Sequence, residues 1–203
     1  DVKRLESYIK RNGLKASAVK VFERLSRDKD EETYTKDVFD LIADKEEEEY
    51  ERSRKFAHDY TFSIVVPAYE TGERRIKEMI QSVIDQTYDK WELCIADASE
   101  SDVVENAVND MSERISGKKA SIKYVRLSEN KGISGNTNEA LKLVTGDSIA
   151  FMDHDDVLTS NALFEAACVL EEGLKSDKEI KLIYSDEDKC TDELDTFFDF
   201  HKK

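Results

Sequence analysis

The sequence has few of the residues on which zinc-binding or membrane-spanning proteins are built. Its 203 residues include three cysteines, three histidines and one proline. Cys94, Cys168 and Cys190 are odd in number and far apart, and the first two lie in apolar segments where a reduced thiol packs as a small hydrophobic side chain. No apolar run approaches the length that spans a bilayer. We therefore expect neither a thiolate metal site nor a transmembrane segment.

Positive charge is also scarce. The chain has 31 lysines and arginines against 46 aspartates and glutamates, and its formal net charge is −15. A nucleic acid would be repelled by this charge, so we expect no nucleic-acid partner, and an anionic ligand would need a cation as mediator. The chain begins at Asp1 without a signal-like apolar stretch. This predicts a cytoplasmic location.

Residues 1–59 read as a helical extension in front of a domain at 60–203. Two stretches before residue 28 have apolar residues at helical spacing and many lysines and arginines, and "DKEEEEYE" at 44–51 is a third, acidic helical segment. Basic amphipathic helices can lie on an anionic membrane surface, here the inner face of the cell membrane. A helical flank docked on its own domain, with its charges in solvent, explains the same pattern.

After residue 60, predicted strands and helices alternate. Strands are expected at 61–66, 91–96, 121–127, 147–153 and 180–185. Helices are expected at 73–86, at 102–115, around 138–144, and from Thr159 or Ser160 to Gly173. Apolar strands separated by helices favour a mostly parallel sheet covered on both faces, so the predicted fold class is α/β.

Three of these strands end in residues suited to ligand binding. They are followed by "PAYE" at 67–70, "DASESD" at 97–102 and "DHDD" at 153–156. Ligands of open parallel sheets bind beyond the carboxyl ends of the strands. Pro67, the only proline, is expected to stop its strand. The residues of each loop taken alone are also common in ordinary turns. The site is predicted because all three loops lie at the same edge of the sheet.

The acidic cluster at 153–156 predicts a divalent cation. Asp153 and Asp155 are separated by one residue, so in an extended segment they point the same way and can meet one ion. Their hard oxygen ligands, with no cysteine and little histidine nearby, suit Mg²⁺ or Mn²⁺ rather than zinc. Asp156 is then left to brace the following turn, and His154 is expected to flank the site.

From Phe62 to about Lys189 the sequence resembles an inverting family 2 glycosyltransferase of the GT-A fold, of the kind that builds bacterial surface polysaccharides. The resemblance is carried by "SIVVPAYE" (63–70), "IQSVIDQTYDKWELCIAD" (80–97), "NKGISGNTNEALKLVTGDSIAFMDHDD" (130–156) and "IYSDEDK" (183–189). It implies a Rossmann-like, mostly parallel sheet flanked by helices, preceded by the helical segment. It also implies a nucleoside-diphosphate sugar, of the UDP or dTDP type, as donor.

The resemblance assigns the first two loops to the nucleoside. Pro67, Ala68, Tyr69 and Glu70 match the loop that cradles the base and ribose, with the Tyr69 ring on or beside the base. Asp97 matches the acid that accepts a hydrogen bond from the N–H of a pyrimidine ring. Many members have two adjacent acids at this point, where this chain has Asp97 followed by alanine.

The remaining motifs are assigned to the diphosphate. Gly132 and Gly135 permit a close approach of the backbone, and Lys131 contributes positive charge near the phosphates. Many members carry an arginine where this chain has Thr137, which leaves more of the neutralisation to the metal. The "DHDD" stretch matches the D-x-D element of the family. The resemblance thus implies that Mn²⁺ or Mg²⁺ on Asp155, with Asp153 as a second ligand or a ribose contact, bridges the diphosphate.

An inverting enzyme also needs a carboxylate base that deprotonates the hydroxyl of a saccharide or lipid-linked acceptor. Asp186, Glu187 and Asp188 are candidates, but in this family the base generally lies further along the chain. We therefore expect a fragment that holds the nucleotide-binding half, lacks the acceptor half and is inactive alone.

Two alternatives remain at this point. "DHDDV" also fits the D-x-D-x-V pattern of haloacid-dehalogenase-like phosphatases, in which Asp153 would be the nucleophile. That family usually opens its core with this strand, whereas here the strand is the fourth. The other alternative is a non-catalytic module that binds nucleotide sugars.

Overall fold

The structure is a computed structural model that describes residues 33–35, 45–116, 119–185, 187–191, 193–194 and 196–198. The chain divides into two compact units, one formed by Ala43–Ile183 and the other by Asp1–Ile42 together with Tyr184–Lys203. The two basic helical stretches predicted before residue 28 lie outside the described residues.

The larger unit is built on four parallel strands in the order β4-β3-β2-β5. Every neighbouring pair is parallel, which confirms the predicted sheet. The strands are β2 (Phe62–Ala68), β3 (Trp91–Asp97), β4 (Ser121–Arg126) and β5 (Ser148–Phe151). Each begins and ends within two residues of its predicted bounds.

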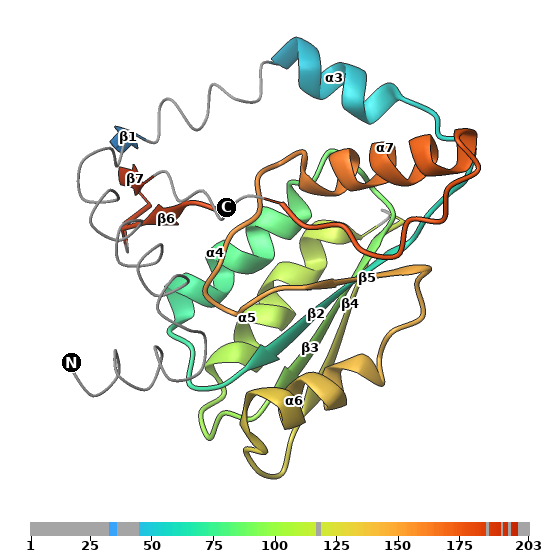
Figure 1. Ribbon diagram of the computed structural model, residues 1–203. Coiled ribbons are helices and arrows are strands. Elements are labelled where there is room, and N and C mark those ends of the chain that lie inside the picture. The colour runs from blue at the N-terminus through green and yellow to red at the C-terminus, as the bar shows by residue number, and fades with distance from the viewer. Residues whose placement is uncertain are drawn as a thin grey trace, which may run out of the picture. The chain divides into compact units, whose positions relative to one another are not determined.

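Helices cover both faces of this sheet, as expected for an α/β fold. Figure 1 shows α4 and α5 on one face and α6 on the other. The helices of this unit are α3 (Lys45–Ser53), α4 (Glu73–Ile84), α5 (Val103–Ser112) with the 3-10 turn η1 (Glu113–Ile115), α6 (Gly132–Leu141) and α7 (Ala162–Lys175). Because β2 and β3 are central, every residue of both strands is buried.

The main core lies between the sheet and the α4 and α5 side. It combines alternate residues of β2 and β3 with the apolar face of α4, whose members recur every three or four residues: Ile76, Met79, Ile80, Val83 and Ile84. Burial of each such side chain stabilises the fold by about 1.5–3 kcal/mol. On the α6 side the cluster is smaller and consists of Val65, Ala96 and Ala140. Most of the hydrophobic packing of the sheet is therefore on the face covered by α4 and α5.

Residues 50–57 pack against α7 within the larger unit. The Tyr50 ring meets the Phe164 ring edge-on at 6.3 Å. Glu171 in α7 accepts hydrogen bonds from the Arg54 guanidinium at 3.0 Å and from the Ala57 N–H at 2.9 Å. The acidic segment at 44–51 is thus largely helical as predicted, whereas the domain boundary near residue 60 stays a prediction.

Three predicted elements differ from the structure. Residues 180–185 form no strand, because no described strand pairs with them, and Leu182 and Tyr184 are 81% and 88% exposed. Helix α6 starts at Gly132, six residues earlier than predicted. Helix α7 continues past Gly173 to Lys175, so this glycine does not end it. The backbone carbonyl of Lys178 and the Ile180 side chain pack against Gly173, which explains the absence of a side chain there.

The smaller unit contains a short antiparallel sheet. Its strands are β1 (Thr33–Thr35), β6 (Lys189–Cys190) and β7 (Thr196–Phe198), in the order β1-β7-β6.

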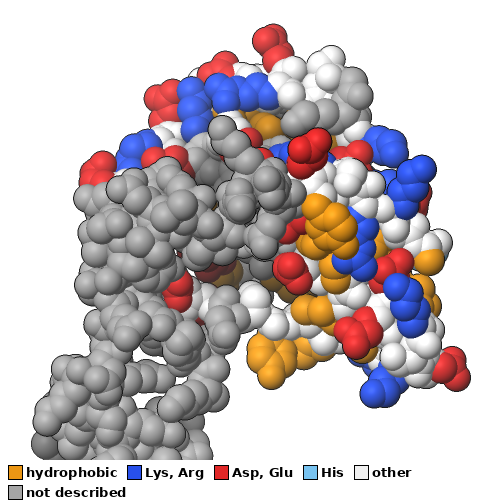
Figure 2. Space-filling model, turned by 90° about the horizontal axis from the view of Figure 1, so that it is seen from above, with side chains coloured by type: hydrophobic (Ala, Val, Ile, Leu, Met, Phe, Trp, Pro, Cys, Tyr) orange, Lys and Arg blue, Asp and Glu red, His pale blue; other side chains and the backbone are white. Residues whose placement is uncertain are grey.

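Charged side chains of both signs are interspersed on the surface. Figure 2 shows acidic and basic groups intermixed over the described face, with hydrophobic side chains in separate patches between them. None of the helices in the described ranges has both the length and the apolar character that crossing a bilayer requires.

A buried carboxylate fastens the amino-terminal ends of the strands. Glu92 in β3 accepts hydrogen bonds from the Ser63 hydroxyl and the Lys123 ammonium, both at 2.7 Å, and from the N–H groups of Thr145 and Gly146. Burial alone would raise the pKa of Glu92, but these donors outweigh it and lower the pKa from 4.5 to about 2. The network ties β2, β3 and β4 to the turn that leads into β5.

The substitution Glu92→Gln tests this network. The variant keeps the shape but leaves Lys123 without its anion, so we expect the free energy of unfolding at pH 7 to fall by about 3–5 kcal/mol. Because the folded pKa is depressed, this contribution is present above pH 4.5 and is lost as the pH falls toward 2. Urea unfolding of both proteins should therefore converge in acid. Glu113→Gln at an exposed site is the control, and a difference that stays constant with pH would contradict the assignment.

The substitution Gly173→Ala tests the packing of α7. Helix propensity alone predicts that alanine stabilises a helix interior by about 1 kcal/mol. An added Cβ would lie 2.5 Å from Ile180 Cγ1 and 2.9 Å from the Lys178 carbonyl oxygen. We therefore expect a loss of about 1–3 kcal/mol. Gly72→Ala, where a Cβ meets open space, is the control in thermal unfolding, and a more stable Gly173→Ala protein would refute the packing.

Candidate functional site

The parallel sheet brings four loops to one edge. They follow β2, β3, β4 and β5 at the carboxyl ends of the strands. In the sheet register Ala68 is beside Asp97 and Asp97 is beside Arg126, so the first three loops start at the same level. Strand β5 ends at Phe151, opposite Val65, so its loop starts three positions before the level of Ala68. This edge is where the sequence placed its candidate residues.

The first loop begins later than predicted. Pro67 does not stop its strand, because β2 continues to Ala68. Ladder pairing on the β5 side ends at Val65, whose carbonyl accepts the Met152 N–H. Pro67 faces this unpaired side, where a residue without an N–H is tolerated. Pro67 does lie next to the first loop, but the prediction that it ends its strand is wrong.

Glu70 joins the first loop to the second. Its φ of +48° is in the left-handed region, which a residue with a side chain adopts only when its surroundings hold it there. Its N–H donates to the Ser99 hydroxyl at 2.8 Å, and its carboxylate accepts the Glu100 N–H at 2.7 Å. Tyr69, immediately before it, is 47% exposed. The two loops are therefore clamped together, and the Tyr69 ring is accessible to a ligand.

Asp97 lies deeper than a ligand-reading acid would. Its side chain has no exposed surface. One carboxylate oxygen accepts the Tyr124 hydroxyl at 2.8 Å and the other accepts the Ser99 N–H at 2.9 Å. A base could reach this carboxylate only if the loop opened. Burial, followed by the bond to Asp97, raises the pKa of Tyr124 well above its ordinary value, so its hydroxyl remains a donor at neutral pH.

Arg126 at the end of β4 holds the second loop in place through its guanidinium. Its guanidinium donates to the carbonyls of Ser99, Glu100 and Ser101 at 3.2, 3.0 and 2.7 Å. It also donates to the carboxylates of Asp102 at 2.5 Å and Glu105 at 3.1 Å. Neither Tyr124 nor Arg126 was predicted to belong to the site. Both lie at every second position of the predicted strand at 121–127, on the same face as Ile122, and polar side chains on an otherwise apolar face are the signal that could have found them.

The loop before α6 is folded around its own side chains. Asn130 accepts the Gly132 N–H at 2.9 Å, and Asn136 accepts the Lys131 N–H at 3.0 Å. Gly132 has a φ of +73°, and a Cβ on Gly135 would lie 2.4 Å from Lys131 Cβ. Both glycines are therefore required by this turn, and the close approach of the backbone to a ligand stays a prediction.

Lys131 is paired within its own segment. Its ammonium donates to Glu139 at 2.8 Å, and Lys142 donates to the same carboxylate. The hydrogen bonds from these two lysines lower the pKa of Glu139 to about 2. Lys131 would have to leave this partner, at least in part, to meet a phosphate.

The acidic loop after β5 is exposed. Asp153, Asp155 and Asp156 are accessible to solvent. His154 turns toward the first loop, where its Nδ1 lies 2.9 Å from the Thr71 hydroxyl oxygen, and that nitrogen is 4.0 Å from the nearer carboxylate oxygen of Asp155. The histidine thus flanks the acids, as expected, and joins two loops of the edge.

The donor set fits a hard divalent cation. No group of three or more His, Cys, Asp or Glu side chains within the described ranges is arranged to hold a metal ion. Asp153 and Asp155 are exposed carboxylates of the acidic loop, which turns so that the Asp156 N–H donates to the Asp153 carbonyl. Mg²⁺ and Mn²⁺ are commonly held by one or two carboxylates and complete their coordination with phosphate oxygens and water. Two exposed acids without a thiolate match that pattern.

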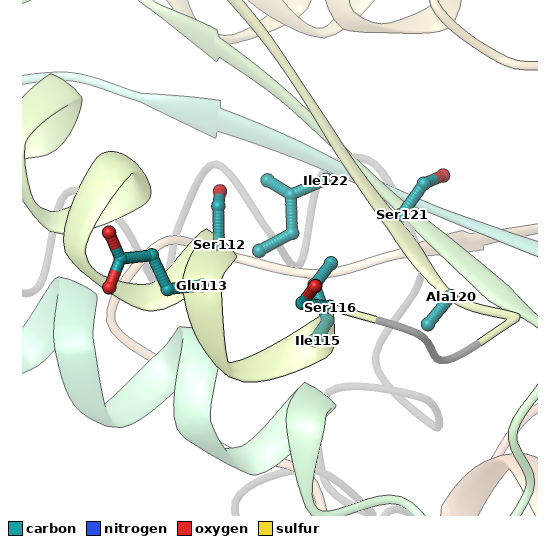
Figure 3. A pocket seen from close by; sticks show the side chains of 7 residues that line it. All are labelled: Ser112, Glu113, Ile115, Ser116, Ala120, Ser121 and Ile122. Atoms are coloured by element: carbon teal, nitrogen blue, oxygen red, sulfur yellow. The ribbon is translucent and has the colours of Figure 1, made fainter.

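One hollow in the described surface lies away from this edge. It has a volume of about 750 Å³ and lies at the other end of β4, where the end of α5, η1 and the first residues of the strand meet (Figure 3). Its lining includes one charged side chain, Glu113. It contains none of the predicted site residues, and the loop edge rather than this hollow is the candidate site.

The three candidate bases lie beyond Ile183, where the larger unit ends. Asp186 lies outside the described residues. Glu187 and Asp188 are exposed and belong to the smaller unit. Their assignment as a catalytic base stays a prediction.

Comparison with known proteins agrees with this geometry. The sequence model of the family described as "Glycosyl transferase family 2" matches residues 63–185, more than half of the chain. The "Uncharacterized protein y4gI" of Sinorhizobium fredii is 32% identical over 139 residues, covering 68% of this chain and 14% of that protein. The "UDP-Glc:alpha-D-GlcNAc-diphosphoundecaprenol beta-1,3-glucosyltransferase WfgD" of Escherichia coli is 38% identical over 105 residues, covering 52% of this chain and 39% of that protein.

One solved structure supports the fold. The mannosyltransferase PcManGT from Pyrobaculum calidifontis, solved in complex with GDP-Man and Mn²⁺, superposes with a TM-score of 0.50 and 21% identity, covering 61% of this chain and 37% of that one. The chain thus spans well under half the length of each of these relatives. The family match includes β2 to β5 and all four loops of the edge. This chain therefore belongs to glycosyl transferase family 2.

Proposed function

We propose that this chain is the nucleotide-sugar-binding part of a metal-dependent, inverting glycosyltransferase. The sugar would pass from a nucleoside-diphosphate sugar to a saccharide or lipid-linked acceptor in the synthesis of a cell-surface polysaccharide. The observation that carries the proposal is the shared edge of the sheet. There, an exposed aromatic ring on one clamped loop and two exposed acids on another occur together in a family 2 chain.

The nucleoside is assigned to the first two loops. Tyr69 offers an accessible ring on which a base can stack, while Pro67, Ala68 and Glu70 shape the backbone beside it. A pyrimidine diphosphate is favoured, because the Escherichia coli relative is a glucosyltransferase named for the donor UDP-Glc. Asp97 would complete base recognition by direct contact only after release from Tyr124, and otherwise by shaping its loop.

The diphosphate is assigned to the acidic loop and to the start of α6. Asp155, with Asp153, would hold Mn²⁺ or Mg²⁺, which would stabilise the negative charge that develops on the departing nucleoside diphosphate. Gly132 and Gly135 allow the backbone to approach the phosphates, and Lys131 supplies positive charge from its pair with Glu139. Thr71 orients His154 and thereby fixes the segment between the two acids.

Transfer of the sugar also needs a base for the acceptor hydroxyl. A carboxylate must take the proton of the acceptor hydroxyl, and Asp186, Glu187 and Asp188 are the candidates in this chain. We further propose a cytoplasmic location, with residues 1–59 as a helical extension that contacts the inner face of the membrane. The phosphatase alternative is not supported, because the family match to glycosyl transferases includes Asp153 and its strand.

A thermal-shift series with nucleoside diphosphates tests the proposed function. We expect UDP with Mn²⁺ to stabilise the chain by about 2.7 kcal/mol at a ligand concentration 100 times the dissociation constant, and UDP alone to stabilise it much less. Asp155→Ala should abolish the effect of the metal, since it removes a direct ligand. Asp89→Asn, an exposed acid at the opposite end of β3, is the matched control. Equal stabilisation of Asp155→Ala and the original chain would refute the metal assignment.

A further inference from the structure

We propose that Arg126 is a positioning residue for the nucleoside, acting through the loop at 97–102 rather than by contact with the ligand. This inference rests on the proposed function. It concerns a residue at the end of β4, outside the loops to which the nucleotide was assigned.

The contacts of Arg126 have an unusual distribution. One nitrogen of the guanidinium meets three successive carbonyls, those of Ser99, Glu100 and Ser101, at 2.7–3.2 Å. Three consecutive peptide carbonyls converge on a cation only if the loop curls around it. A guanidinium can hold these carbonyls with one nitrogen and the carboxylates of Asp102 and Glu105 with another because its donors are spread over a rigid planar fork, whereas a lysine ammonium is a single compact point charge on a flexible stem. The shape of the second loop therefore depends on this side chain.

That shape is passed on to the first loop. With its carbonyls turned to Arg126, the second loop presents the Glu100 N–H and the Ser99 hydroxyl to Glu70. These two bonds hold Glu70 at its left-handed φ of +48°. Tyr69 is the adjacent residue, so the backbone that carries its exposed ring is held beside Glu70. Hydrogen bonds thus connect Arg126 through the second loop to Glu70, the residue next to the one that would stack on the base.

Arg126 also forms ion pairs, which hold its side chain against the start of α5. Its second nitrogen meets Asp102 and Glu105 at the beginning of α5. The bond to Asp102 is the main cause that raises the pKa of Arg126, and the cation is therefore permanent. If Arg126 only stabilised the fold, its ion pairs would be the contacts that matter. If it positions the nucleoside loops, the hydrogen bonds to the three carbonyls matter, and substitutions can distinguish the two roles.

The test compares two ligands by titration calorimetry in the presence of Mn²⁺. UDP would engage the nucleoside loops, the acidic loop and the start of α6, whereas inorganic pyrophosphate would engage only the last two. For Arg126→Gln we expect the affinity for UDP to fall roughly tenfold or more, because the loops must be ordered on binding, and the affinity for pyrophosphate to stay within about twofold. Arg126→Lys, which keeps the charge but not the fork, should resemble Arg126→Gln.

Glu105→Gln is the matched control, because it removes an ion pair of Arg126 but leaves the three carbonyl contacts. Its affinity for UDP should stay within about twofold of the original chain. Unchanged UDP affinity in Arg126→Gln would overturn the inference and leave the proposed function intact. Equal weakening of UDP and pyrophosphate would also overturn it, since general damage has that signature. If the original chain bound no UDP with Mn²⁺, the proposed function would fail first and this inference with it.

Discussion

The common direction of the four sheet strands is the constraint on which the site depends. Because β2, β3, β4 and β5 are all parallel, their carboxyl ends meet at one edge, and the loops that follow them become neighbours. The register is fixed by burial. A shift of one residue in β2 or β3 would turn Ile64 or Leu93 away from the main core toward the thinner α6 side, where Glu92 now lies in its own network. The core therefore determines which residues reach the edge and at what height.

The two sides of that edge differ in how firmly hydrogen bonds hold their loops. On the β3 and β4 side, Asp97, Tyr124, Arg126 and Glu70 connect the loops by hydrogen bonds, and the buried polar groups have partners. On the β5 side, Asp153 and Asp155 stand in solvent. An ordered half that presents an aromatic ring, beside an acidic half that needs a cation, suits a ligand with a flat base at one end and phosphates at the other. This asymmetry is what we expect of a site for a nucleoside diphosphate.

The sequence predicted the sheet well because its strands are nearly continuous apolar runs, and such runs are typical of central parallel strands. It also placed Tyr69, Asp153 and Asp155 at the shared edge, and the family resemblance added Gly132 and Gly135. It failed where pairing or packing decides the outcome. The apolar run at 180–185 has no described strand beside it, and Gly173 lies within a helix because Ile180 and the Lys178 carbonyl fill the space next to it. The burial of Asp97 could not be foreseen either, because it depends on Tyr124, 27 positions away along the chain.

Paramagnetic broadening tests the central claim most directly. Mn²⁺ would be added with UDP to the isotope-labelled chain, and the loss of backbone amide signals would be followed by NMR. We expect the signals of residues 153–156 to vanish first, followed by those of 69–71 and 131–133 at the same edge. With a net charge of −15, the chain offers other places where a cation could gather, including the acidic residues of α3. Broadening centred on residues 45–51, with the loop signals unchanged, would contradict the proposed metal site.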